Sequence, residues 1–165
     1  MSRKDSSFFS IQTKVWSLVI LRIAIGYWFL KFGYAKYTGM LEGTKLTAQL
    51  AGLTKDMPPG WFPWYQSFLT DVVASHASFF AYLILFGELA VGAALVIGFL
   101  TRPALLAGMF MNLSYHLASG YKPGASGFVN MVFICAELSL IFTPVGRCLG
   151  VDYFLHRIFP RLRFI

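Results

Sequence analysis

Residues 79–100 read FFAYLILFGELAVGAALVIGFL, an apolar stretch in which Glu88 is the single charged side chain. A transmembrane helix needs about 20 consecutive, mainly apolar residues, so this stretch is long enough to cross a bilayer. A second apolar stretch, WSLVILRIAIGYWFLKFGYA, occupies residues 16–35. Two such segments in one short chain predict an integral membrane protein.

The composition supports this interpretation. The chain has 165 residues, of which 57% are hydrophobic and 13% are charged. Soluble domains carry about 25% charged residues, so a soluble globular enzyme is excluded, and a disordered chain would be poor in hydrophobic and aromatic residues. The net charge of +7 comes mainly from basic residues near the chain ends, beside hydrophobic segments. This pattern favours membrane lipids rather than nucleic acid as partners, because no RNA- or DNA-binding signature accompanies the charge.

Four apolar segments predict an all-α integral membrane protein, a single four-helix domain over residues 1–165. The predicted spans are residues 14–36, 79–100, 103–118 and 127–143, with a long outer loop at 37–78. The second and third spans meet at a tight turn. There we expect Thr101 to cap the third helix and Pro103 to take its first position.

Basic residues predict the orientation. Eight lie on one side of the four spans and four on the other: Arg3, Lys4, Lys14, Arg102, Arg147, Arg157, Arg161 and Arg163 against Lys36, Lys45, Lys55 and Lys122. Loops rich in Lys and Arg stay in the cytoplasm. We therefore expect both termini on the cytoplasmic side of a bacterial or archaeal cytoplasmic membrane.

The outer loop has a helical pattern of its own. Apolar residues recur at helical spacing before and after the break at Pro58–Gly60, which predicts two short helices along the outer membrane surface. The aromatic residues after the break are Trp61, Trp64 and Tyr65. They indicate either an interfacial aromatic belt, as is common in membrane proteins, or a platform that binds a ligand.

Four charged residues fall inside the predicted spans: Arg22, Lys31, Glu88 and Glu137. A charge in hydrocarbon is costly unless it is paired. From the 1.5 Å rise per residue, we expect a buried cluster with Arg22 as its hub, Glu88 and Glu137 as rival partners, and Asn112 as a further hydrogen-bonding group. Two carboxylates beside one guanidinium favour proton uptake by one acid. In the alternative, Arg22 and Glu88 form a fold-fixing ion pair and Glu137 reaches cytoplasmic water.

Lys31 and His116 are further polar candidates. Lys31 lies half a turn from Arg22 around the helix, so it either snorkels toward the outer interface near Tyr27 and Tyr34 or contacts a ligand. His116 follows Asn112 by one turn, where Asn130, Lys31 or a bound ligand are its expected neighbours; the alternative is a purely structural histidine. No motif for haem, flavin or metal is found, and Cys135 and Cys148 are interpreted as structural thiols.

Three segments carry a family resemblance: LRIAIGYWFLKFGYAK at 21–36, GELAVGAALVIGFLTRPALL at 87–106 and TPVGRCLGVD at 143–152. The matching residues are Arg22, Gly26, Gly33, Glu88, Gly92, Gly98, Thr101 and Arg102. Together they resemble the DoxX-like family, and the long aromatic loop is more similar to its DoxD branch, the small membrane subunit associated with thiosulfate:quinone oxidoreductase. The resemblance implies a four-helix membrane protein in quinone-linked sulfur or respiratory chemistry, working with a second subunit.

Three functions are compatible with these features. In the first, the chain is a subunit of a quinone-dependent oxidoreductase. Quinone would be held by the bundle and the outer loop, with Glu88, Glu137 or His116 exchanging protons and Trp61, Trp64, Tyr65, Lys31 and Asn130 as weaker ligand-binding candidates. In the second, it is a non-catalytic accessory subunit of a larger respiratory or photosynthetic membrane assembly. The third, a proton-coupled permease, is disfavoured because four short spans leave little room for alternating access.

Overall fold

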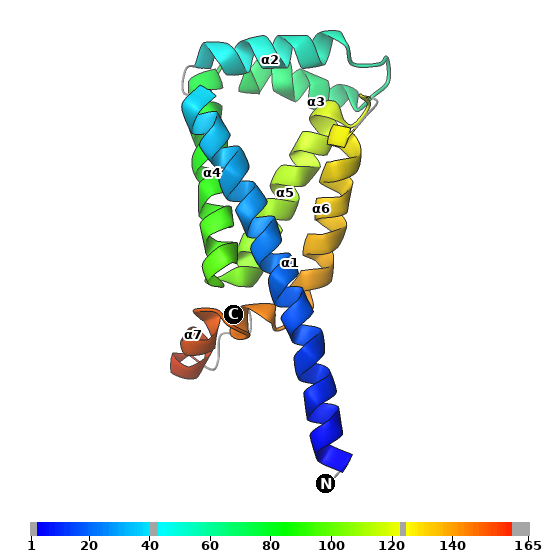
Figure 1. Ribbon diagram of the computed structural model, residues 1–165. Helices are drawn as coiled ribbons and strands as arrows, with labels where there is room; N and C mark the ends of the chain where they lie inside the picture. The colour runs from blue at the N-terminus through cyan, green and yellow to red at the C-terminus, as the bar shows by residue number, and fades with distance from the viewer. Residues whose placement is uncertain (1–2, 40–42, 123–124, 160–165) are drawn as a thin grey trace.

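A computed structural model describes residues 3–39, 43–122 and 125–159, and these residues contain helices but no β-strand. The elements in chain order are α1 (Arg3–Gly39), α2 (Gly43–Lys55), α3 (Pro63–Ser67), a π-helical segment η1 (Phe68–Val73), α4 (Ala77–Ile97), α5 (Thr101–Ser119), α6 (Ala125–Ile141), a 3₁₀ turn η2 (Val145–Arg147) and α7 (Asp152–Ile158). Figure 1 shows α1, α4, α5 and α6 running along the molecule, with α2 and α3 across one end and α7 at the other. The two ends of the bundle therefore differ: α2 and α3 lie at the predicted outer end, and α7 lies at the predicted inner end.

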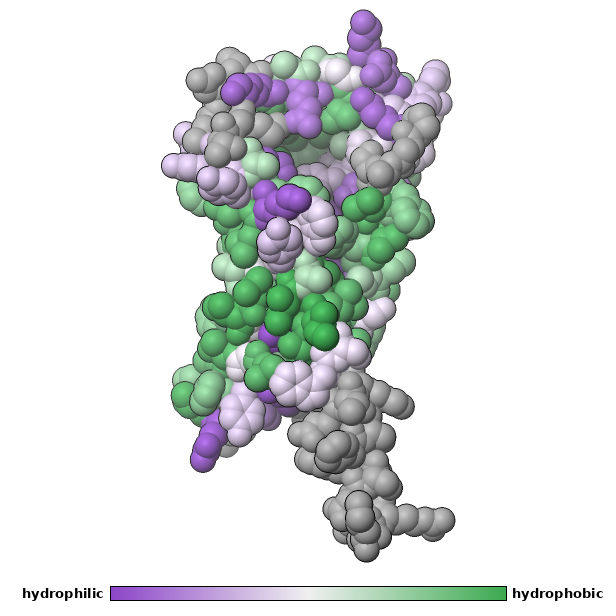
Figure 2. Space-filling view, in the orientation of Figure 1, coloured by the Kyte–Doolittle hydropathy of each residue, from purple (hydrophilic) through white to green (hydrophobic). Residues whose placement is uncertain are grey.

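Two helical segments are long and apolar enough to cross a membrane: Trp16–Tyr37 within α1, and α4. Only 33% and 28% of their apolar windows are buried inside the protein, whereas the core helix of a soluble protein would hide most of its apolar surface. Figure 2 shows hydrophobic residues across the middle of one face of the molecule, between more polar ends. The chain is thus an all-helical protein with two candidate spans. The shorter apolar segment Gly127–Ile141 in α6 lies beside α5 in the same bundle.

Small residues bring α1 and α4 together. A Cβ atom added at Gly92 would lie 2.7 Å from the Leu30 backbone nitrogen and 2.8 Å from the Gly26 carbonyl oxygen. Neither backbone atom can move without shifting its helix, so this crossing needs glycine. Small residues at such a crossing let two helix backbones approach closely.

The outer loop forms a structured cap. The expected helices are present as α2 and α3, and the break between them contains Gly60 with a positive φ of 87°. Leu46, Leu50 and Tyr65 are buried in a cap core, together with Met57, Leu69, Val73 and Ala77. This core is separate from the one that the bundle encloses around Leu95, Leu105 and Leu140.

The turn between α4 and α5 differs from the prediction. Leu100, not Thr101, precedes the first helical residue, and Pro103 stands at the third position of α5 rather than the first. The cap comes from a distant residue: the Asp152 carboxylate accepts hydrogen bonds from the backbone amides of Leu100 at 2.7 Å and Thr101 at 2.9 Å. A carboxylate satisfies these free amides and complements the positive end of the helix dipole.

Candidate functional site

The four expected members of the charge cluster are all buried, but they do not form one cluster. Arg22, Glu88, Asn112 and Glu137 are each at most 5% exposed. Among the described residues, no salt bridge joins Arg22 to either acid. The polar groups instead divide into three separate sites.

Arg22 binds the C-terminal segment. Its Nη1 atom donates to the Val145 carbonyl oxygen at 2.8 Å and its Nη2 atom donates to the Leu149 carbonyl oxygen at 3.0 Å. Gly98 permits this approach, because it has a φ of 66° and a Cβ there would lie 2.7 Å from Nη1. The predicted Arg22 hub is therefore wrong, and so is the alternative Arg22–Glu88 ion pair: the guanidinium satisfies backbone carbonyls beyond α6.

The direction of helical side chains explains this outcome. Side chains tilt toward the N-terminus of their own helix. Since α1 and α4 run in opposite directions (Figure 1), Arg22 points toward the α7 end and Glu88 toward the cap end. The two side chains diverge although their helices touch.

Glu88 lies at the centre of the second site. Its Oε1 atom accepts hydrogen bonds from Lys36 Nζ at 2.5 Å and from the Tyr115 hydroxyl at 2.6 Å. Its Oε2 atom is buried and has no hydrogen-bond partner among the described residues. The lysine nitrogen also lies 5.2 Å from the centre of the Tyr115 ring. Lys36 from α1 and Tyr115 from α5 thus both bind the carboxylate that α4 contributes. We call Lys36, Glu88 and Tyr115 the Glu88 site.

The Glu88 site is open on one side. The Lys36 side chain is 25% exposed, whereas that of Glu88 is 1% exposed. Lys36 therefore links the buried Glu88 carboxylate to the surface of the protein. Figure 2 shows that this face of the protein is hollowed below the polar cap end.

Glu137 and Asn112 form the third site. The Asn112 amide nitrogen donates to both carboxylate oxygens of Glu137, at 3.2 Å and 3.1 Å. Glu137 is fully buried, so it does not reach cytoplasmic water as the alternative interpretation expected. The pair joins α5 to α6.

His116 lies near the cap. Its Nδ1 atom is 3.3 Å from the Gly127 carbonyl oxygen, and its ring packs against Trp61 with centroids 6.3 Å apart. No hydrogen bond joins His116 to Lys31 or Asn130 within the described residues. The ammonium of the exposed Lys31 instead lies 4.5 Å from the centre of the Trp28 ring.

The aromatic residues of the loop mainly attach the cap to α5. Trp61 Nε1 donates to the Leu117 carbonyl oxygen at 2.9 Å, and the Tyr65 hydroxyl donates to the Ser114 carbonyl oxygen at 2.9 Å. Trp64 is 64% exposed, and Asn130 is half-buried on α6.

Two members of the Glu88 site were missed from the sequence. Lys36 was counted as an outer-loop cation because it ends the apolar stretch, yet it follows Gly33 by three residues and shares its helix face. Tyr115 follows Asn112 by the same spacing on the polar face of α5. That spacing is the signal that could have identified both residues.

In the described ranges, no three His, Cys, Asp or Glu side chains come together as a metal-binding group. Apolar helices that expose their hydrophobic faces, around buried and paired charges, define a helical membrane protein with a polar interior site. The particular family is also shown: the chain belongs to the DoxD family, since the family model described as TQO small subunit DoxD matches residues 16–163. The resemblance found in the sequence is confirmed. No solved structure matches the chain.

Proposed function

We propose that this chain is the membrane subunit of a thiosulfate:quinone oxidoreductase and that the Glu88 site binds the quinone headgroup. The observation that carries the proposal is the buried Glu88 carboxylate. Lys36 and Tyr115 donate to one of its oxygens, and the other has no hydrogen-bond partner in the part of the chain that the structure describes. Buried ionisable groups inside membrane helices typically mark substrate or proton pathways.

The chemistry of the Glu88 site suits a quinone. Reduction to the quinol consumes a pair of electrons and a pair of protons. Thiosulfate would supply the electrons through a partner subunit, and the Lys36 ammonium would donate a hydrogen bond to a quinone oxygen. The Glu88 carboxylate would take up and pass on protons through its Oε2 atom. A general acid or base of this kind contributes about 10²- to 10⁴-fold to a rate.

The proposal includes the membrane arrangement. α1, α4, α5 and α6 each cross the bilayer, residues 1–165 form one membrane domain, and both termini lie in the cytoplasm of a bacterium or archaeon. The Glu88 site then opens toward the outer leaflet, below the cap. Glu137 and His116 remain proposed secondary proton sites, and Trp61, Trp64, Tyr65, Lys31 and Asn130 remain proposed contacts for the quinone.

The test is thiosulfate-dependent quinone reduction by the purified complex. Glu88→Gln keeps the shape of the side chain but removes its charge, so we expect the rate to fall by about 100-fold. Arg157→Gln, which removes an exposed cation from α7 at the opposite end of the bundle (Figure 1), should leave the rate unchanged. Glu137→Gln reports whether the third site takes part.

A non-catalytic accessory role is the second candidate. Tyr27, Trp28 and Phe32 form an exposed aromatic cluster on α1, with ring centroids 5.6 to 6.1 Å apart. Such a surface suits packing against a helix of another subunit. An assembled complex that reduces quinone at the full rate with Glu88→Gln would favour this role and contradict the first.

A further inference from the structure

The Glu88 site connects to water at one end of the bundle. Lys36 lies in the last turn of α1 and directly precedes Tyr37, where the apolar segment of that helix ends. Its side chain is 25% exposed, and its Nζ atom lies 2.5 Å from the buried Glu88 carboxylate. Water at the cap end therefore reaches a group that is hydrogen-bonded to Glu88.

An apolar core lies between Glu88 and the opposite end of the bundle. Val91 and Leu95 follow Glu88 along α4 toward the α7 end (Figure 1). They belong to one packed cluster with Leu105 of α5 and Phe29 of α1, and each of these four side chains is at most 6% exposed. Close-packed interiors contain few voids larger than a water molecule. The cluster therefore separates Glu88 from the α7 end.

The other buried polar groups do not continue a route from Glu88 through this core. Asn112 donates to both oxygens of Glu137, and within the described part of the chain no hydrogen bond joins this pair to the Glu88 site. Arg22 donates to backbone carbonyls of the C-terminal segment. A guanidinium does not lose its proton in proteins, so Arg22 cannot pass protons on.

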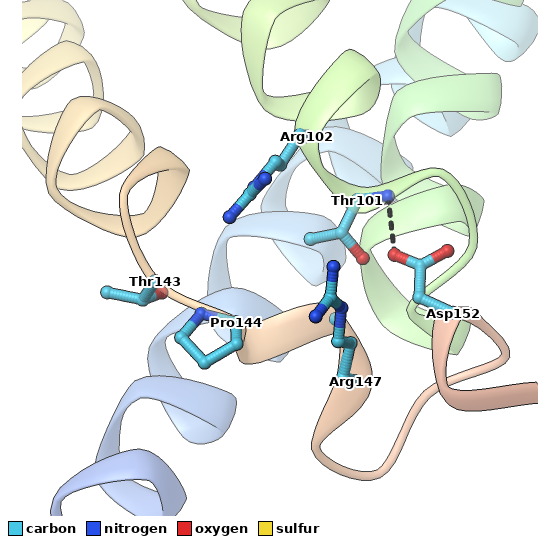
Figure 3. Close-up of a pocket in the computed structure, with 7 residues that line it drawn as sticks. Thr101, Arg102, Thr143, Pro144, Arg147 and Asp152 are labelled. Carbon is cyan, nitrogen blue, oxygen red and sulfur yellow. Dashed lines mark hydrogen bonds between the residues drawn. The ribbon is translucent and has the colours of Figure 1, made fainter. Parts of the chain in front are cut away.

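The α7 end of the bundle is closed by the C-terminal segment. Figure 3 shows this segment against the start of α5, where the Asp152 carboxylate accepts a hydrogen bond from the Thr101 backbone amide. A Cβ atom added at Gly146 would collide with the Asp152 carboxylate and with the Thr101 hydroxyl. The pocket beside them has a volume of about 10 Å³, which is room for about one water molecule. It cannot hold a chain of water molecules that leads into the core.

We infer that Glu88 takes up protons from the aqueous phase at the cap end, through Lys36, and takes none from the α7 end. This inference rests on the proposed reduction of quinone at the Glu88 site. The Lys36 ammonium gives a proton to the Glu88 carboxylate, so an N–H bond breaks and an O–H bond forms. The Lys36 amine recovers a proton from the water on its exposed side, and Glu88 passes its own proton to a substrate oxygen.

Protons and electrons balance in each turnover. Coupling of a pair of thiosulfate ions through a new sulfur–sulfur bond at the partner subunit releases a pair of electrons and no proton. Reduction of one quinone consumes that pair of electrons and a pair of protons, and it forms an O–H bond at each quinone oxygen. Each turnover therefore removes a pair of protons from the phase at the cap end and none from the phase at the α7 end.

Proteoliposomes test the direction of proton uptake. They contain the purified complex, a membrane quinone and a pH-sensitive dye in the lumen, and thiosulfate is present on both sides. Labelling of Ser75→Cys, an exposed position at the cap end, with a maleimide that cannot cross membranes measures the fraction of complexes whose cap faces the lumen. We expect the lumen to become alkaline at an initial rate proportional to that fraction, and a protonophore should abolish the pH change. A rate proportional to the complexes whose α7 end faces the lumen would overturn the inference.

Lys36→Arg separates proton transfer from charge. Arginine keeps a cation beside Glu88, but its guanidinium stays protonated. We expect kcat for quinone reduction to fall by about 100-fold, with little change in KM or in melting temperature. The solvent deuterium isotope effect on kcat should rise, because proton transfer then limits the rate. Lys45→Arg, at an exposed position on α2, is the matched control and should keep the full kcat. A full kcat for Lys36→Arg would overturn the role of Lys36.

The quinone site and the direction of proton uptake can fail separately. A complex that reduces quinone at the full rate with Glu88→Gln contradicts the quinone site and, with it, this inference. A complex whose rate depends on Glu88 but which takes its protons from the α7 end keeps the quinone site and overturns this inference alone.

Discussion

At the residue scale, the direction in which each side chain points decides which buried polar groups meet. Similar depth in the bundle does not. Glu137 and Asn112 lie on helices that run in opposite directions, so each side chain tilts toward the other. Lys36 and Glu88 converge for the same reason, while Arg22 and Glu88 diverge. A depth estimate combined with the direction of each helix would have predicted the Lys36–Glu88 and Asn112–Glu137 pairs.

The Lys36–Glu88 ion pair leads to a stability prediction. Lys36→Met leaves the buried carboxylate without its cation, and we expect the free energy of unfolding to fall by about 3 kcal/mol. Adding Glu88→Gln removes the unpaired charge, so the double variant should be more stable than Lys36→Met alone. Thermal unfolding in detergent micelles measures the stability of Lys36→Met, Glu88→Gln and the double variant. If the double variant lost as much stability as the two single variants together, the two side chains would not be coupled.

Sequence reasoning correctly identified which residues are buried. Arg22, Glu88 and Glu137 were singled out because charges are rare inside apolar helices, and each is at most 1% exposed. Their partners were harder to predict, since Arg22 binds backbone carbonyls near Val145 and Leu149. Any residue type could supply those carbonyls, so no pattern in the sequence marks them.

At the scale of elements, the contact between α1 and α4 depends on Gly92. Gly92→Ala places a Cβ within 2.8 Å of backbone atoms of α1, so we expect the free energy of unfolding to fall by about 1–3 kcal/mol. Gly87→Ala is the control on the same helix, because its Cβ would meet only the flexible end of Met111, at 3.3 Å. Unfolding titrations of Gly92→Ala and Gly87→Ala measure the two free energies of unfolding. Equal stability of both would show that the helices are not in close contact at Gly92.

The cap should loosen at high pH. Burial raises the pKa of the Tyr65 phenol above its usual value of 10.0, and the hydrogen bond to Ser114 opposes this effect. A group whose pKa is raised on folding adds stability at pH values below its unfolded pKa and loses that contribution as the pH rises. Wild-type protein should therefore become more susceptible to proteolysis in residues 43–73 above about pH 10.

Tyr65→Phe tests the origin of this effect. The variant lacks the ionisable group, so its proteolysis should change less between pH 9 and pH 11 than that of the wild type. It should also be cleaved somewhat faster at neutral pH, since the hydrogen bond to the Ser114 carbonyl is lost. Trp64→Phe, at an exposed position, serves as the control. An identical pH profile for Tyr65→Phe and the wild type would assign the effect to another group.

At the scale of the whole molecule, the cap and the C-terminal segment occupy opposite ends of one bundle (Figure 1). The sequence predicted this separation from its loop lengths and its basic residues. It did not predict that Asp152 caps α5 or that Arg22 holds the segment after α6. Both are contacts between residues more than 50 positions apart, which local patterns cannot reveal.

The proposed four crossings would place the two ends of the molecule on opposite sides of the membrane. Single cysteines at Ser75, in the corner before α4, and at Arg157, on α7, both occupy exposed positions and can be introduced after Cys135→Ser and Cys148→Ser. A maleimide that cannot cross membranes should label Ser75→Cys in intact cells and Arg157→Cys only in inverted vesicles, because basic loops stay in the cytoplasm. The parent without cysteines gives the background signal. Labelling of both positions from the same side would mean that an even number of helices crosses between them, so that α4, α5 and α6 do not all span the bilayer.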